Sequence, residues 1–430
     1  MVGIFGSAAA LSGQSTLRRN VMLDLISLVG VGITVSIVAA LLPGISRHAG
    51  LDPLGIAFLA AAPFFANLLG VFACQWGPRS QRGLAAFRAG GALLLVLMFL
   101  MPIPVALAAL ATGYWMALAF SNPVQQRLWG AMYPASERGR MVGMVQTGRS
   151  AAAGAAVLVG GMLADRIGGM TVVAFAGVVG ALCAIASSRI TAPITEDART
   201  FSARESWAAF RSRPGLVQVG AAQTFYGGGL IAAGPLLALV QVDRLGLTIA
   251  DIGVLGILGS IAATVACLVW GSFIDRRGAI FILRIGGFLG FIVLALYAAA
   301  PSIEILFLAS IIAGVANAST DLGISAVVSE QVPQQERGAA VAGFNALTGA
   351  RGMIAPFLAS IAVQAGILSV THALVVCALA TGVGACMYLR LSRDGAPRPW
   401  REVMPRPAVA GVERGRRLAR TLVVSVMTGL

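Results

Sequence analysis

A few charged side chains lie deep inside long apolar stretches of this sequence, where they could carry proton or anion chemistry. Asp321 lies in one such stretch, and Arg149 and Arg351 lie in two others among glycine and other small residues. A carboxylate whose pKa is raised by burial and lowered by a nearby Arg can take up and release a proton. A guanidinium can hold an anionic group through two hydrogen bonds. Because ionisable groups are costly in apolar surroundings, their retention indicates function.

The same residues also allow a structural interpretation. Asp321 and Arg351 could form an ion pair, because a short loop joins their two stretches. Asp24 is a second candidate for proton coupling, although its place near the start of a stretch could put it at an interface. Each remaining cavity candidate could instead satisfy a neighbouring backbone, and Arg127 could extend to the inner surface. These candidates are Asn122, Gln126, Arg127, Gln146, Gln223, Tyr226 and Asn345.

The composition indicates that the apolar stretches face lipid. The 430 residues are 58% hydrophobic and 11% charged, with a mean hydropathy of +0.86, whereas soluble domains carry about 25% charged residues. We therefore expect an all-α integral membrane protein, because lipid offers the backbone no hydrogen bonds. The net charge of +14 comes from Arg without any Lys. Since these Arg residues lie in short loops and the C-terminal tail, they favour orientation in a membrane over nucleic-acid binding.

Twelve stretches approach the length of about 20 apolar residues that spans a bilayer. They cover residues 21–42, 54–75, 84–100, 105–132, 141–164, 169–187, 216–240, 252–273, 279–299, 303–328, 339–365 and 370–388. The polar segment 191–214 divides them into bundles of six, at 21–190 and 215–392. Residues 1–20 and the basic tail 393–430 flank the bundles. Most loop Arg residues fall on one side if both termini are cytoplasmic, which predicts that orientation. Part of the linker, 203–210, is predicted to form a short helix on the membrane surface.

The two halves repeat each other in the loops after the fourth and tenth stretches. Pro134-Ala-Ser-Glu-Arg-Gly139 corresponds to Pro333-Gln-Gln-Glu-Arg-Gly338, and the same offset places Asn122 opposite Asp321. The loop Gly271-Ser-Phe-Ile-Asp-Arg-Arg-Gly278 resembles the signature loop of the major facilitator superfamily. Its first-half counterpart, Gly77–Gly83, lacks the Asp. The resemblance implies a twelve-helix fold of two pseudo-symmetric bundles.

The resemblance also implies a gating role for the signature loop. Asp275 would face the positive end of the fifth helix near Met141, a charge–dipole contact of about 0.3–2 kcal/mol. Gly278 allows the tight turn, and Glu330 is a candidate partner for the loop Arg residues, which could alternatively only fix topology. The predicted gating residues are Gly271, Asp275, Arg276, Arg277, Gly278 and Glu330.

We expect a multi-pass secondary transporter that moves a small organic solute across the inner membrane of a bacterium by alternating access. Proton coupling is expected, and export is favoured over uptake because the chain resembles the twelve-helix drug-efflux type in its size and short outer loops. The alternatives are an uptake or facilitated permease for an anionic or lipid-like solute, or a non-transporting assembly factor with this fold. We expect a monomer that contacts lipids, and no enzyme activity, cofactor, metal or nucleic acid.

Overall fold

The computed structural model is helical across the residues it describes, which are 2–70, 77–101, 103–133, 138–191, 202–333 and 336–391. For residues 2–15 and 138–140 it describes only the backbone. Eleven of the described helices are long and apolar enough to cross a membrane. A twelfth, α3, is apolar but has 17 residues. The expected second stretch continues to residue 75, and its part beyond residue 70 lies outside the described residues, as do most of the linker and the basic tail.

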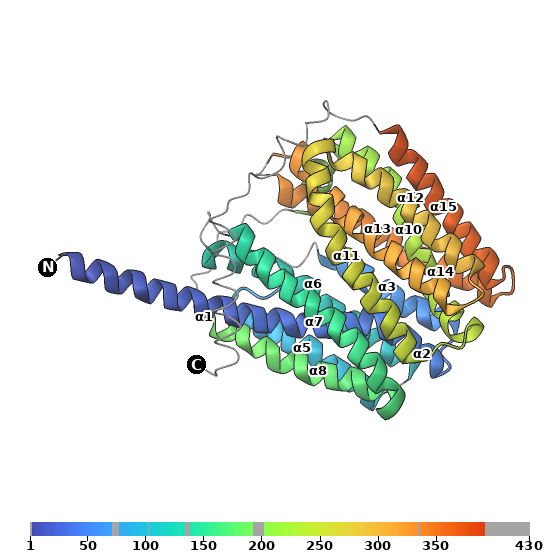
Figure 1. The fold of residues 1–430 in the computed structure, drawn as a ribbon, viewed down its shortest axis with the longest axis horizontal. Helices are drawn as coiled ribbons and strands as arrows, with labels where there is room; N and C mark the ends of the chain where they lie inside the picture. The colour runs from blue at the N-terminus through green and yellow to red at the C-terminus, as the bar shows by residue number, and fades with distance from the viewer. Residues whose placement is uncertain are drawn as a thin grey trace.

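The described helices form two halves, each with six long helices (Figure 1). The first half contains α1 (Val2–Ser36), η1 (Ile37–Leu41), α2 (Leu42–His48), α3 (Pro53–Leu69), α5 (Gln81–Leu100), α6 (Pro104–Met132), α7 (Arg138–Ile167), α8 (Gly169–Ile185) and η3 (Ala186–Arg189). The second half contains α10 (Pro214–Leu239), η4 (Val240–Arg244), α11 (Ile249–Arg277), α12 (Ala279–Ala299), α13 (Ile303–Gln331), α14 (Arg337–Gln364) and α15 (Val370–Arg390). Between them lies α9 (Ala203–Arg211). We call the membrane face that carries α9 the linker face, and the other the opposite face.

The linker helix α9 packs on the second half, which confirms the helix expected at 203–210. Its first turn is closed by a capping box, in which Ser202 accepts from the Glu205 N–H and Glu205 accepts from the Ser202 N–H. Phe210 is 3% exposed and meets Phe344 of α14 with ring centroids 6.2 Å apart. This buried anchor ties α9 to the second half.

Two antiparallel helix pairs join the halves, α7 with α11 and α3 with α14. Glycine permits the first contact, because a Cβ on Gly161 would lie 2.7 Å from the Ile249 carbonyl oxygen. In the second pair, a Cβ on Gly352 would lie 2.1 Å from the Phe64 ring. Helices in lipid associate through close packing of this kind, since no hydrophobic force joins them.

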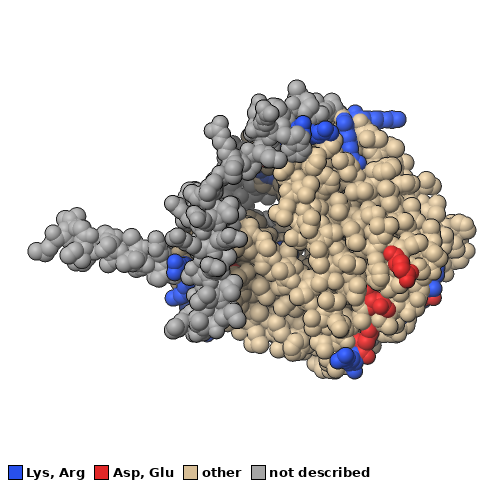
Figure 2. All heavy atoms as spheres, in the orientation of Figure 1, with Lys and Arg blue, Asp and Glu red and all other residues tan. Residues whose placement is uncertain are grey.

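The outer surface is apolar where lipid would cover it. Figure 2 shows a broad belt without charged residues, with Arg and acidic residues at its margins. Large apolar side chains are exposed at the surface, for example Leu268 at 77% and Phe175 at 63% exposure. An apolar surface of this extent fits a multi-pass membrane protein and not a water-soluble one.

Candidate functional site

A buried polar network in the second half holds three of the predicted site residues. The Arg351 guanidinium donates to the Gln223 carbonyl oxygen and to the Thr348 hydroxyl, the latter at 3.4 Å. Tyr388 donates to the Gln223 side-chain oxygen, and its ring meets Tyr226 edge-on at 5.9 Å. The ion pair expected between Arg351 and Asp321 is not formed in this conformation. The Arg351 guanidinium instead donates to a backbone carbonyl oxygen of α10.

Asp24 in the first half is buried inside the protein, near the end of the membrane-spanning segment where Tyr133 lies. Its side chain is 0% exposed, and its carboxylate accepts from Gln125 Nε2 at 2.9 Å, Trp129 Nε1 at 2.8 Å and Tyr133 Oη at 2.7 Å. The three donors are spaced four residues apart, so they share one face of α6 and the residue that follows it. A carboxylate satisfied by three buried donors joins α1 to α6 and is poorly placed for exchange with a cavity.

The environment beside Asp24 changes the pKa of the Tyr133 hydroxyl. It follows the last residue of α6 and therefore lies just outside the membrane-spanning segment. Burial raises the pKa of the Tyr133 hydroxyl, and the charge of Asp24 and the hydrogen bond between them raise it further. The hydroxyl consequently stays protonated and remains a donor to Asp24 at alkaline pH.

The side chains of a second group of predicted site residues have no hydrogen-bonded or ion-paired partner among the residues that the structure describes. Its charged members lie in both halves, with Arg149 on α7 and Asp321 on α13. Asp321 is exposed, and Arg149 is half-buried. The full group is Asp321, Arg149, Asn122, Gln126, Arg127, Gln146 and Asn345. Unpartnered polar groups inside membrane helices are the groups that a solute or a proton can engage.

Three residues of this second group lie at a similar depth. Asn122 and Asp321 each lie ten residues from the linker-face end of their helices, and Arg149 lies eleven residues from the start of α7. At about 1.5 Å per residue, this is roughly 15 Å into the membrane. Solute sites between repeated bundles are typically near this midplane.

The halves are closed against each other at the opposite face. Arg47 donates to both carboxylate oxygens of Asp243, with a shortest separation of 2.6 Å. His48 Nε2 lies 2.9 Å from the Leu247 carbonyl oxygen, and Gln364 donates to Asp52 at 3.1 Å. Each of these contacts joins one half to the other, so together they seal this side of the interface.

Toward the linker face the halves separate. Figure 1 shows α7 and α11 diverging from their contact at the opposite face, and Figure 2 shows a hollow between the halves on this side. Asp275 is exposed, and within the described chain its carboxylate has no partner. The contact with the start of α7 near Met141, implied by the resemblance, is therefore not made in this conformation. Arg277 lies over the Phe281 ring at 4.8 Å.

The sequence agrees with this architecture. A model of the Major Facilitator Superfamily matches residues 25–299 and, in an overlapping second match, residues 219–429. The chain belongs to the major facilitator superfamily. The resemblance inferred from the signature loop is thereby confirmed. No curated protein sequence matches the chain.

Solved structures of superfamily transporters share the fold. The nucleoside transporter NupG superposes with a TM-score of 0.69, covering 87% of this chain and 98% of that one at 14% identity. A bacterial homologue of the human lysosomal transporter Spinster, inward-facing and unoccupied, gives 0.60 with 89% and 99% coverage at 14% identity. The human organic anion transporter MFSD10 gives 0.60 with 87% and 99% coverage at 14% identity. At this identity the likeness establishes the fold alone.

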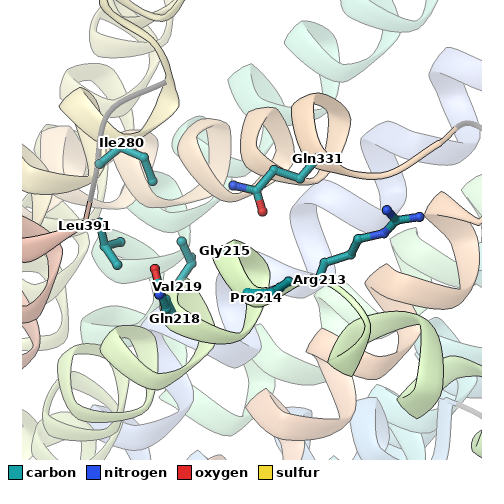
Figure 3. A pocket seen from close by; sticks show the side chains of 8 residues that line it. All are labelled: Arg213, Pro214, Gly215, Gln218, Val219, Ile280, Gln331 and Leu391. Atoms are coloured by element: carbon teal, nitrogen blue, oxygen red, sulfur yellow. The ribbon is translucent and has the colours of Figure 1, made fainter. Parts of the chain in front are cut away.

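A cavity of about 430 Å³ at the linker face of the second half is separate from the mid-membrane group. In Figure 3 the Gln331 side chain points toward Gly215, while the guanidinium of Arg213 extends away. Arg213 is ion-paired with Glu336 at 3.1 Å. The lining residues are Arg213, Pro214, Gly215, Gln218, Val219, Ile280, Gln331 and Leu391. Its only charged lining residue is thus already paired.

Sequence reasoning missed the residues that close the opposite face, together with buried Arg88. Arg88 is 5% exposed and donates to the Ser27 hydroxyl at 3.0 Å. Its place within an apolar stretch was a usable signal. Arg47 and Asp243 lie in separate turns 196 residues apart, and no local pattern in the sequence pairs them.

Proposed function

We propose that this superfamily member is a secondary transporter that moves a small organic solute across the inner membrane of a bacterium by alternating access. The observation that carries the proposal is the combination of a closed opposite face with unpartnered polar groups of both halves at mid-membrane depth. We take the linker face as cytoplasmic from the distribution of loop Arg residues. On that assignment, the structure corresponds to a state open toward the cytoplasm.

We propose proton coupling through Asp321, with export favoured as the direction. Asp321 is exposed and unpartnered within the described chain, whereas Asp24 is buried and holds three donors. A carboxylate can gain or lose a proton in each cycle only if water or solute reaches it. This contrast favours Asp321 over Asp24 as the coupling residue.

The structural neighbours support a transport function but do not identify the solute. Those compared above are described as transporters of nucleosides and of organic anions, which differ in charge and shape. Because function depends on the site and not on the fold, the solute must be found by experiment.

The test is proton movement in proteoliposomes that carry a pH gradient and an internal pH dye. Nucleosides, organic anions, organic cations and amino acids are added one class at a time. We expect one class to evoke proton flux in the wild type and none in Asp321→Asn, while exchange of solute across the membrane persists. Glu304→Gln is the matched control, because it removes an exposed carboxylate at the other end of the same helix.

Two results would count against the proposal. Flux that is unchanged in Asp321→Asn would exclude the proton-coupling role. A wild-type protein that moves none of these solute classes, with or without a gradient, would contradict transport and support the assembly-factor alternative.

A further inference from the structure

Arg149 differs from three other arginines in the membrane, Arg88, Arg351 and Arg284, because no side chain or backbone group of the described chain pairs with its guanidinium. Arg88 donates to Ser27 at 3.0 Å, and Arg351 donates to the Gln223 carbonyl oxygen. Arg284 donates to the carbonyl oxygens of Tyr388, at 3.2 Å, and Leu391, at 2.6 Å. A cation without a partner in the membrane is costly, so the structure needs another reason to retain it.

The half-buried side chain of Arg149 lies beside α1 and near α6. The side chain passes α1 at Gly32, where an added Cβ would lie 3.2 Å from Arg149 Cγ. It also lies within electrostatic range of Tyr114 on α6. The Tyr114 hydroxyl donates to Thr34 at 2.8 Å, and no hydrogen bond joins it to the Arg149 guanidinium. Gln146, one turn earlier on the same face of α7, has a buried side-chain oxygen without a hydrogen bond.

The charges around this position also favour an anion. Arg88 lies close enough to interact repulsively with Arg149, and Asp24 near Arg88 is already satisfied by its three donors. Within the second group of predicted site residues, Arg127 adds a second unpartnered cation on α6, against one unpartnered carboxylate, Asp321, on the other half. The unpartnered ionisable groups therefore carry a net positive charge.

We propose that Arg149 binds the anionic group of the transported solute, and that the solute is an organic anion such as a carboxylate. This inference rests on the proposed transport function. The guanidinium holds a planar carboxylate through two parallel N–H donors, and the Gln146 amide is one turn away to donate a third hydrogen bond. The bound anion supplies the negative charge that no described residue of the protein pairs with Arg149.

The first test needs no knowledge of the solute, because it compares the thermal stability of solute-free variants in detergent. Arg149→Met is expected to raise the Tm, since it removes an unpaired buried cation. Arg88→Met is expected to lower the Tm, since it breaks a buried hydrogen bond. Arg204→Gln, on the exposed surface of α9, controls for the loss of one positive charge. A fall in Tm for Arg149→Met would show a structural role and overturn the proposal.

The second test measures recognition with matched solutes. Acetate, benzoate and succinate are each compared with the corresponding carboxamide, as ligands that raise the Tm and as solutes taken up by proteoliposomes. We expect at least one carboxylate to be recognised and its carboxamide to be rejected. This difference should be at least tenfold in apparent affinity, lost in Arg149→Met and kept in Arg204→Gln.

The outcomes separate this inference from the proposed function. If proteoliposomes move neutral or cationic solutes and Arg149→Met moves them equally well, transport stands and the anion proposal is wrong. If the wild type moves no solute of any charge, the proposed transport function is wrong. The anion proposal, which rests on that function, is then wrong as well.

Discussion

The carboxylate of Asp165, near the end of α7, accepts a hydrogen bond from the backbone N–H of Ile249 at 3.0 Å, at the start of α11 in the other half. The neighbouring N–H of Ala250 donates to the same carboxylate at 2.9 Å. A negative charge at the positive end of a helix is stabilising. Because α7 and α11 are antiparallel, Asp275 near the end of α11 is placed to make the reciprocal contact with the start of α7. In this conformation only the Asp165 contact is formed.

Replacing Asp165 with Asn should weaken closure at the opposite face. Loss of the charge–dipole contact at this exposed position should cost about 0.3–1 kcal/mol, a shift of about two- to fivefold between states. Spin labels at Ala49 and Ile367, in exposed turns of the two halves, would report a larger population of long distances. Asp251→Asn is the control, because Asp251 caps the same helix from within its own half. Equal effects of both substitutions would contradict a role specific to contact between the halves.

A methyl group at Gly161 should also open the opposite face, for a steric reason. The added Cβ would lie 2.7 Å from the Ile249 carbonyl oxygen. This oxygen belongs to the backbone, so no side-chain rotation can relieve the clash. Gly154→Ala is the matched control on the same helix, because its Cβ would meet Ser260 at an ordinary 3.6 Å. We expect Gly161→Ala to lengthen the same spin-label distance and Gly154→Ala to leave it unchanged. If the alanine at 154 had the greater effect, this packing account would be wrong.

The sequence was sufficient for the helices and for the plan of the halves. Stretches of apolar residues predicted the spans because lipid permits little else, and the capped helix α9 followed from the polar linker. The sequence was not sufficient to show which candidate side chains have a hydrogen-bonded or ion-paired partner and which have none. Asp24 and its donors lie between 101 and 109 residues apart, and hydropathy does not encode how two distant helices rotate toward each other. The four-residue spacing of Gln125, Trp129 and Tyr133 indicated a shared face, but not the carboxylate it would meet.

The contrast between the two carboxylates predicts that their removal has very different effects on stability. Asp24→Ala should lower the Tm strongly, because it leaves three buried donors without an acceptor, at about 1–3 kcal/mol for each unsatisfied group. Asp321→Ala removes an exposed carboxylate that has no partner in the described chain and should leave the Tm nearly unchanged. Thermal unfolding of both variants in detergent checks the pair. A loss in Asp321→Ala as large as that in Asp24→Ala would contradict the assignment of Asp24 to structure and Asp321 to function.

Stability at alkaline pH should depend on Tyr133. Burial, followed by the charge of Asp24, raises the pKa of its hydroxyl in the folded protein, whereas an unfolded Tyr ionises near pH 10. The unfolded state therefore loses this proton first, and the stabilisation, complete below pH 10, decreases above it by about 1.4 kcal/mol per pH unit. Tyr133→Phe cannot ionise, so its Tm should fall less than that of the wild type between about pH 9 and pH 11. Every other ionisable group is common to both proteins, so parallel Tm curves would show that the Tyr133 hydroxyl is not held protonated by Asp24.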